Sequence, residues 1–249
     1  MNQQANERID EVNDKLRLIQ RLDGLTFGTD ALLLAGYVGG RYKKGIELGS
    51  GTGIITMLLL TREKLERAVC LEVQPDYAEL TGRNAELNSL EGRMSSVCAD
   101  VREYKPEAEC ELVYTNPPYM RTGAGRSNIS GAKNIARHEV HGTIRDFVSS
   151  AAKMLKWGGD FFAVYRPDRL AELISAMTEC GIEPKRMTLV HADTDAAPSM
   201  VLIEGRRGGG HGMRVTCPLI IYKDEKHREY GADMNYIMEN GSFPDKYKV

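Results

Sequence analysis

Four consecutive residues, Asn116, Pro117, Pro118 and Tyr119, carry the clearest chemistry in the sequence. They follow the apolar run 111–115, so we expect them at the end of a buried strand, facing a ligand crevice. The two prolines remove two N–H donors, which leaves the Asn116 side-chain oxygen and the Pro117 carbonyl as acceptors. Such acceptors suit an –NH2 group, and they would stabilise positive charge that develops on its nitrogen during attack on an electrophile. Tyr119 offers a face on which a planar group can stack, worth about 1–3 kcal/mol for a base.

A second candidate site is the run Glu47-Leu48-Gly49-Ser50-Gly51-Thr52-Gly53, which joins a predicted strand to a predicted helix. Glycines let the backbone turn sharply and let a ligand touch the main chain. Glu72 ends the next predicted strand, where a carboxylate can bind ribose hydroxyls. Asp100 ends the strand after that, where it can accept from an adenine amino group. The G-x-G-x-G spacing differs from the dinucleotide-binding pattern, and Glu47 suits a ligand with an ammonium group rather than a diphosphate.

The elements that must position these residues alternate along the chain. Short apolar runs are followed by helical patterns, which is typical of an α/β fold with a parallel sheet. Strands are expected at 45–48, 68–73, 95–99, 111–115, 161–165, 187–191 and 200–204, and helices at 54–63, 75–88, 143–155 and 167–180. Further strands are expected at 16–19, 25–27 and 218–222, with residues 156–159 as a helix stop. Three acids at successive strand ends then lie at one edge of the sheet, where ligands bind in such folds.

Composition sets the remaining bounds. A net charge of −2 with 42% hydrophobic residues describes an ordinary globular chain and argues against a protein that coats nucleic acid indiscriminately. The five cysteines include no C-x-x-C pair, so we expect no metal site and no disulfide framework. We find no signal peptide and no membrane-length apolar run, so a cytoplasmic protein without a membrane partner is expected. The oligomeric state stays open.

The motifs carry a resemblance to known families. The Glu47–Gly53 run, Glu72 and Asp100 resemble the nucleoside-binding motifs of Rossmann-like S-adenosylmethionine methyltransferases. The motif at Asn116–Tyr119 resembles that of amino-methyltransferases acting on adenine N6 or glutamine N5. With segments 27–35, 136–139 and 198–205 included, the chain resembles the bacterial tRNA(Val) adenine-N6 methyltransferase family over roughly residues 7–225.

The resemblance implies an α/β Rossmann-like sheet of seven strands, mostly parallel with an antiparallel last strand and helices on both faces. It implies an N-terminal extension (1–44) that completes the cofactor pocket, a methyltransferase core (45–206) and a C-terminal tail packed on the core (207–249). The implied cofactor is S-adenosyl-L-methionine, and its implied binding residues are Thr29, Asp30, Glu47, Gly49, Gly51, Gly53, Glu72, Asp100, Val101 and Asn116. The implied catalytic residues are Asn116, Pro117 and Tyr119. For Thr29 and Asp30 a helix N-cap is an equal alternative.

The implied substrate is the anticodon-adjacent adenine of tRNA(Val). Segment 120–137 contains four cations and no acid, and these are candidate RNA contacts: Arg121, Arg126, Lys133 and Arg137. A second basic cluster contains Arg206, Arg207, His211 and Arg214. A solvated loop is the alternative for both clusters. The amino-group chemistry also leaves open glutamine N5-methylation of release factors and guanine N2-methylation of rRNA. A DNA methyltransferase is disfavoured because no segment is large enough for a target-recognition domain, and the intact Asn116–Tyr119 motif argues against a non-catalytic binding protein.

Overall fold

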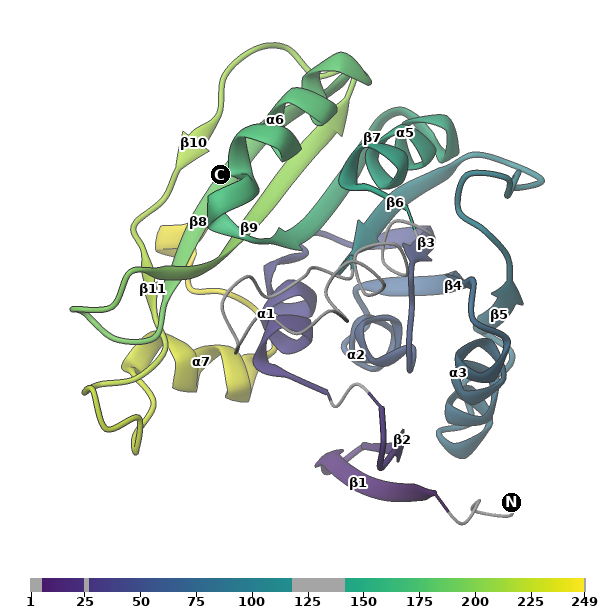
Figure 1. The fold of residues 1–249 in the computed structure, drawn as a ribbon, viewed down its shortest axis with the longest axis horizontal. Helices are drawn as coiled ribbons and strands as arrows, with labels where there is room; N and C mark the ends of the chain where they lie inside the picture. Colours follow the sequence, from purple (N-terminus) through teal and green to yellow (C-terminus); the bar gives the residue numbers. More distant parts are fainter. Residues whose placement is uncertain (1–5, 25–26, 118–141, 249) are drawn as a thin grey trace, which may run out of the picture.

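Buried apolar runs form a twisted central sheet (Figure 1). The computed structural model of the protein describes residues 6–24, 27–117 and 142–248. The strands of the sheet are β3 (Tyr42–Leu48), β4 (Leu65–Glu72), β5 (Met94–Cys98), β6 (Cys110–Thr115), β7 (Leu155–Tyr165), β8 (Ile182–His191), β9 (Pro198–Arg207), β10 (Arg214–Val215) and β11 (Leu219–Ile220). A separate hairpin contains β1 (Glu7–Asn13) and β2 (Leu16–Arg21).

The seven strands from β3 to β9 lie in the order β5-β4-β3-β6-β7-β9-β8. Only β9 among these seven runs antiparallel to its neighbours, and the others are parallel. This confirms the predicted mostly parallel sheet with an antiparallel last strand. The short strands β10 and β11 both pair in parallel with β8 and widen the sheet beyond the predicted seven. β11 lies inside the strand expected at 218–222.

Helices cover both faces of the sheet, as predicted. They are α1 (Thr29–Tyr37), α2 (Ile54–Thr61), α3 (Pro75–Leu87), α5 (Ile144–Met154), α6 (Leu170–Glu179) and α7 (Ala232–Asn240), with short 3-10 turns η1 (Pro167–Arg169) and η2 (Asp245–Tyr247). The buried residues of α1, α2 and α7 form one apolar cluster, and those of α5 and α6 form another across the sheet. Helix α7 has no counterpart among the predicted elements.

Two boundaries differ from the sequence-based expectation. Helix α5 ends at Met154, so the helix stop expected at 156–159 is confirmed, but these residues also belong to β7, which begins at Leu155 directly after α5. Gly158 has φ +78°, and the register of β6 against β7 shifts between Cys110 and Leu112, so a bulge lets the strand continue through this stretch. The N-cap of α1 is Gly28, and no side chain caps this helix, so the N-cap alternative for Thr29 and Asp30 is wrong.

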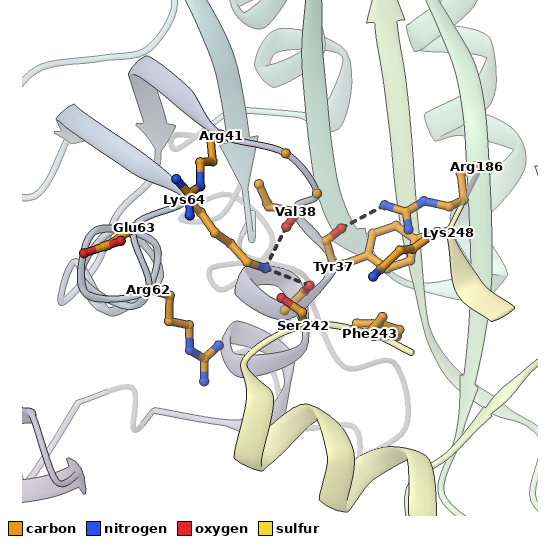
Figure 2. A pocket seen from close by; sticks show the side chains of 13 residues that line it. Tyr37, Val38, Arg41, Arg62, Glu63, Lys64, Arg186, Ser242, Phe243 and Lys248 are labelled. Carbon is orange, nitrogen blue, oxygen red and sulfur yellow. Dashed lines mark hydrogen bonds between the residues drawn. The ribbon is translucent and has the colours of Figure 1, made fainter. Parts of the chain in front are cut away.

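The C-terminal end of helix α1 is held by a lysine side chain from another part of the core. The carbonyl groups of Ala35 and Gly36 and of the C-cap residue Val38 accept hydrogen bonds from the buried Lys64 ammonium (2.9, 3.0 and 2.7 Å). Figure 2 shows the bonds to Gly36 and Val38. Carbonyls at a helix end have no partner within the helix, so Lys64 takes the place of a C-terminal cap.

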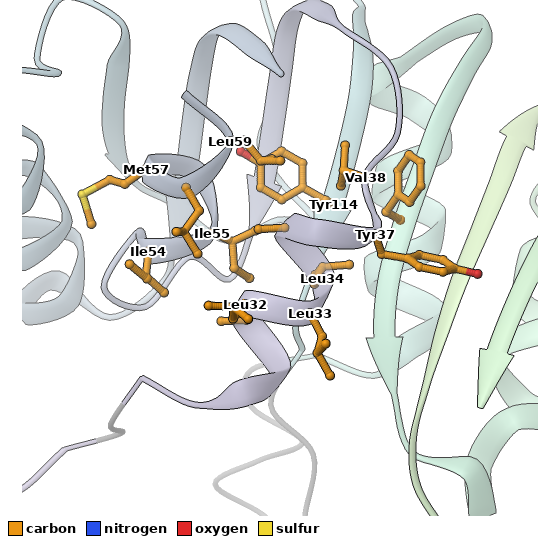
Figure 3. Packing of buried hydrophobic residues seen from close by; sticks show 14 of the residues in the cluster. Leu32, Leu33, Leu34, Tyr37, Val38, Ile54, Ile55, Met57, Leu59 and Tyr114 are labelled. Carbon is orange, nitrogen blue, oxygen red and sulfur yellow. The ribbon is translucent and has the colours of Figure 1, made fainter. Parts of the chain in front are cut away.

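The core between α1 and α2 is almost entirely aliphatic. In Figure 3, Leu32 and Leu34 of α1 lie beside Ile55 of α2, and Tyr114 of β6 closes the cluster against the sheet. Both helices are apolar on all sides, which is expected for helices buried on every face. Each such leucine or isoleucine contributes about 1.5–3 kcal/mol when it is fully buried.

The hairpin β1–β2 packs against α3 through polar contacts. The Asn84 side chain accepts from Ile19 N–H (2.7 Å) and donates to the Ile19 carbonyl (3.1 Å), so it pairs with β2 as a strand would. Arg83 forms an ion pair with the buried Glu7. The strand expected at 16–19 is therefore present, and the hairpin leads the chain past the end of β4. No helix in the described part of the chain is long and apolar enough to span a membrane.

Candidate active site

A cavity of about 480 Å³ opens where β3, β4 and β6 end. Six of the residues singled out in the sequence line it: Gly49, Gly51, Glu72, Asp100, Val101 and Asn116. Among the described residues, seven others that sequence reasoning missed also line it: Asp23, Gly24, Leu71, Val73, Gln74, Tyr77 and Phe147. They come from the hairpin's exit, the end of β4, α3 and α5. The fold thus brings the acids of successive strand ends together around one space, as parallel strands should.

The glycine loop takes a backbone path that other residues rarely adopt. Gly49, Gly51 and Gly53 have φ of +68°, +55° and +78°. A Cβ on Gly51 would meet no atom within 4 Å, so this glycine leaves the cavity open beside its main chain. Gly53 caps α2 instead, and a Cβ there would come within 2.4 Å of Met94 and 2.9 Å of Thr81. Packing therefore requires a glycine at position 53, and Gly53 does not line the cavity.

Glu72 is fixed at the cavity wall by two main-chain donors. Its Oε2 accepts from Gly51 N–H (2.9 Å) and its Oε1 from Gln74 N–H (3.0 Å). The side chain is buried, and each oxygen keeps lone pairs that can accept from a ligand hydroxyl. The carboxylate thus joins the glycine loop to the start of α3 while presenting acceptors to the cavity.

Asp100 lines the cavity, and its carboxylate already has hydrogen-bonding partners within the protein. It accepts from the backbone N–H of Arg102 (2.9 Å) and forms an ion pair with the guanidinium of the same residue. The sequence analysis missed Arg102. An adenine amino group that hydrogen-bonds to Asp100 must therefore share the carboxylate with this arginine. The neighbouring Val101 is buried and adds apolar wall.

Glu47 lies behind the loop and does not line the cavity. Its Oε2 accepts from the N–H (3.2 Å) and the hydroxyl (2.5 Å) of Thr56, and the Cys70 thiol approaches it. Burial raises the pKa of Glu47 to about 8. The strand alternates, so Ile46 and Leu48 pack on the α5 side of the sheet while Glu47 faces α2. In this position Glu47 holds the start of α2 and makes no contact with the cavity.

Asn116 is oriented by Asp30. Its side-chain Nδ2 donates to Asp30 Oδ2 (2.8 Å), across a sequence separation of 86 residues. A carboxylate can only accept, so the amide nitrogen must face Asp30 and the amide oxygen must face away from it. That oxygen, Asn116 Oδ1, is buried and has no hydrogen-bond partner among the described residues. A buried acceptor without a partner is costly, so this atom is ready for a donor from a ligand.

The other predicted site residues are placed as follows. Thr29 and Asp30 form the first turn of α1 and do not line the cavity, and Pro117 is buried after β6. Tyr119, Arg121, Arg126, Lys133 and Arg137 lie outside the described residues. The second basic cluster lies away from the cavity: Arg206 pairs with Asp160 at the opposite edge of the sheet, where β9 ends. In the described part of the chain, no three His, Cys, Asp or Glu side chains are grouped as a metal site would require.

A sheet of this strand order, with a glycine loop and strand-end acids around one cavity, defines the Rossmann-like class of methyltransferases. Comparisons with known proteins agree. The family model for the methyltransferase small domain matches residues 22–179, and the chain belongs to this family. Its methyl donor is S-adenosylmethionine, and the prediction of an S-adenosylmethionine-dependent methyltransferase is confirmed.

Individual relatives add detail. The chain is 24% identical to the tRNA1(Val) (adenine(37)-N6)-methyltransferase of Phocaeicola vulgatus over 71% of this chain and 74% of that one. Its fold is similar to that of a predicted O-methyltransferase from Agrobacterium tumefaciens (TM-score 0.70, 23% identity, 87% of this chain and 98% of that one). It is also similar to geranyl diphosphate C-methyltransferase from Streptomyces coelicolor, solved with S-adenosyl-L-homocysteine (TM-score 0.53, 14% identity, 71% and 79%).

Proposed function

We propose that this protein transfers the methyl group of S-adenosylmethionine to N6 of an adenine in tRNA, namely the adenine beside the anticodon of tRNA(Val). The printed activity of the Phocaeicola vulgatus relative supports this substrate. The observation that carries the proposal is Asn116 at the wall of the cavity, whose Oδ1 is buried and has no hydrogen-bond partner among the described residues. An exocyclic amino group brings the N–H donor that this oxygen requires.

The residues around the cavity fit the cofactor. Glu72 presents fixed acceptors that suit ribose hydroxyls, and Leu71, Val73, Val101 and Phe147 offer the apolar walls that suit an adenine ring. When bound, S-adenosylmethionine supplies an electrophilic methyl group on a sulfonium centre. We propose Gly49 and Gly51 as its main-chain contacts, and Glu47 and Gly53 as residues that shape the loop from behind.

Asn116 would act on the amine. Its Oδ1 accepts one amino hydrogen and, with the Pro117 carbonyl as the predicted second acceptor, favours a nitrogen whose lone pair points at the methyl group. Positive charge that develops on nitrogen is then stabilised by oriented acceptors, and removing one such group typically costs 10²–10³-fold, about 2.7–4 kcal/mol. No base is required before attack, since the proton can leave afterwards. Stacking on Tyr119 and RNA contacts by Arg121, Arg126, Lys133 and Arg137 stay predictions.

The N-terminal segment is proposed to complete the cofactor pocket. Asp23 and Gly24, at the exit of β2, line the cavity together with Gln74 and Tyr77. The cations that the tRNA phosphates require would come from segment 120–137, and we expect the enzyme to work in the cytoplasm, where tRNA is found. The tail from residue 207 onward packs on the sheet edge through β10 and β11 and on α1 through α7.

The test is transfer of labelled methyl from S-adenosylmethionine to unmodified total tRNA, followed by nucleoside analysis. We expect labelled N6-methyladenosine concentrated in tRNA(Val), and loss of at least about 100-fold in turnover for Asn116→Ala. The matched control is Asn235→Ala, an exposed asparagine at the start of α7. Label in rRNA guanine or in release-factor glutamine, with none in tRNA, would keep the amino-group chemistry and overturn the substrate.

A further inference from the structure

A second cavity, of about 380 Å³, lies at the opposite end of α1 from Asn116. It is bounded by the end of α1, the loop into β3, the turn after α2 and the segment after α7 (Figure 2). Five cationic side chains line it: Arg41, Arg62, Lys64, Arg186 and Lys248. Glu63 is the one acid among the described residues that line it, and in Figure 2 its carboxylate points away from the labelled cations.

Lys64 gives this cavity a buried positive charge. Its ammonium is 8% exposed and is hydrogen-bonded to three main-chain carbonyls, with no carboxylate in ion-pair distance among the described residues. Burial, followed by the positive charges of Arg62, Arg186 and Lys248, lowers the pKa of Lys64 to about 7. A buried charge without a counter-ion is expensive, so the surroundings of Lys64 favour an anion.

The remaining cations divide into two kinds. Arg186 forms an ion pair with Glu204 and donates to the carbonyls of Tyr37 and Tyr247, so it forms a fixed wall of the cavity. Arg62 has one long contact with the Gly241 carbonyl (3.4 Å), and no ion pair links Arg41 or Arg62 to any acid in the part of the chain that the structure describes. Two guanidinium groups are thus available to a ligand in the same cavity.

We propose that this cavity binds a phosphate group through Arg41 and Arg62, with Lys64 behind it and the Ser242 hydroxyl beside it. Guanidinium groups suit phosphate because their paired N–H donors match two of its oxygens. The carbonyl end of α1 would repel an anion on its own, and Lys64 in its ammonium form covers those carbonyls and makes the local charge positive. The phosphate belongs either to a small molecule or to the backbone of the RNA.

This site is separate from the methyl-transfer site, and its existence does not rest on the proposed function; only the assignment of its phosphate to RNA, which uses the KM for tRNA, rests on it. The nine residues of α1 span about 13 Å at 1.5 Å each, and Asp30 stands in the first turn while Gly36 and Tyr37 stand in the last. A phosphate here lies at the amino edge of the sheet, whereas the glycine loop and Asn116 lie at the carboxyl edge. It therefore cannot be the attacking or leaving group of the reaction.

The test is calorimetric titration with inorganic phosphate at constant ionic strength. We expect saturable binding to the wild type, and a Kd at least about tenfold higher for Arg41→Gln/Arg62→Gln, since about 1.4 kcal/mol corresponds to a factor of 10. The matched control is Arg17→Gln/Arg67→Gln, which removes two exposed charges elsewhere. The single variant Arg41→Gln, at an exposed position, repeats the test without disturbing the partly buried Arg62.

The possible results distinguish between no phosphate site, a site for the RNA backbone and a site for a small molecule. No saturable binding to the wild type, or equal weakening in the variant and its control, would overturn the site. If phosphate binding is lost in the variant, the KM for tRNA identifies the source of the phosphate. A raised KM in Arg41→Gln/Arg62→Gln but not in the control assigns the site to the RNA backbone, and an unchanged KM assigns it to a small phosphate-bearing molecule.

Discussion

Asp30→Ala is the change that most directly tests the candidate active site. In the structure Asp30 does not line the cavity but accepts a hydrogen bond from Asn116 Nδ2 at 2.8 Å, and this contact fixes which end of the amide faces the ligand. Without Asp30 the side-chain amide of Asn116 can flip, and its oxygen is no longer held in the position that an amino group needs. We therefore expect a defect in catalysis rather than in cofactor affinity.

The magnitude follows from the type of bond. A hydrogen bond to a charged group contributes about 1.5–3 kcal/mol net. If this energy is needed to hold Asn116 in the transition state, kcat falls about 10- to 150-fold, at 1.36 kcal/mol for each factor of ten. Asp30→Asn keeps an oxygen that can accept from Asn116 and loses only the charge, so its kcat should fall less than that of Asp30→Ala.

The assay pairs single-turnover methylation at saturating tRNA with calorimetric binding of S-adenosyl-L-homocysteine. We expect Asp30→Ala to lower kcat and to leave the cofactor Kd within about threefold, a change of less than 0.7 kcal/mol. Glu172→Ala is the matched control, because Glu172 is also an acid in a helix first turn and is exposed on α6. An unchanged kcat with a weakened Kd would refute the reasoning and would make Asp30 a cofactor contact, as the sequence resemblance implies.

Three further predictions concern neighbouring groups. Gly28→Ala places a Cβ 2.5 Å from Asp30 Oδ1 and should displace that carboxylate, so it should reproduce part of the kcat loss of Asp30→Ala in the same assay, with the fold kept because φ at Gly28 is −119°. Glu72→Gln removes the charge that holds the Gly51 and Gln74 N–H groups, and calorimetry should show a cofactor Kd about tenfold higher, about 1.4 kcal/mol, with kcat at saturation nearly unchanged. Glu47 has a folded-state pKa of about 8 against about 4.3 unfolded, so the folded state holds an extra proton between these values and stability falls as pH rises through the window. Glu47→Gln cannot titrate, so its stability relative to wild type, from urea unfolding, should increase with pH between 5 and 8, and a pH-independent difference would contradict the burial argument.

The sequence predicted the sheet well because each strand of the core is a short apolar run bounded by turn residues. Strand β7 was the exception, since residues 156–159 were expected only as the stop after a helix, whereas the structure also has them in a bulged strand. Sequence propensity cannot distinguish a helix stop from a bulged strand, because the bulge depends on pairing with β6, which is distant in the chain. Helix α7 was missed for a related reason: its buried apolar side chains, Met234 and Ile237, are few, and their burial against α1 is a tertiary contact.

The candidate site was predictable only as far as the strand ends define it. Glu47 sits in a run that is buried on both faces, so no alternation of polar and apolar residues revealed that its side chain faces α2. Phe147, Tyr77 and Gly24 reach the cavity from three other elements, and nothing local to them signals this. Asp100 was placed at the cavity correctly, yet its pairing with Arg102, two residues on, was a signal present in the sequence and not used.

Among the described residues, the acids around the reaction centre act mainly on the protein's own donors. Glu72 orders Gly51 and Gln74, Glu47 orders Thr56, and Asp30 orders Asn116. A site that relied on a strong base would instead present a carboxylate or histidine to the reacting nitrogen. Here the atom left unpaired at the cavity wall is the neutral amide oxygen Asn116 Oδ1. Preorganised acceptors of this kind lower the barrier by being in place before charge develops, which is what methylation of a weakly nucleophilic amino group requires.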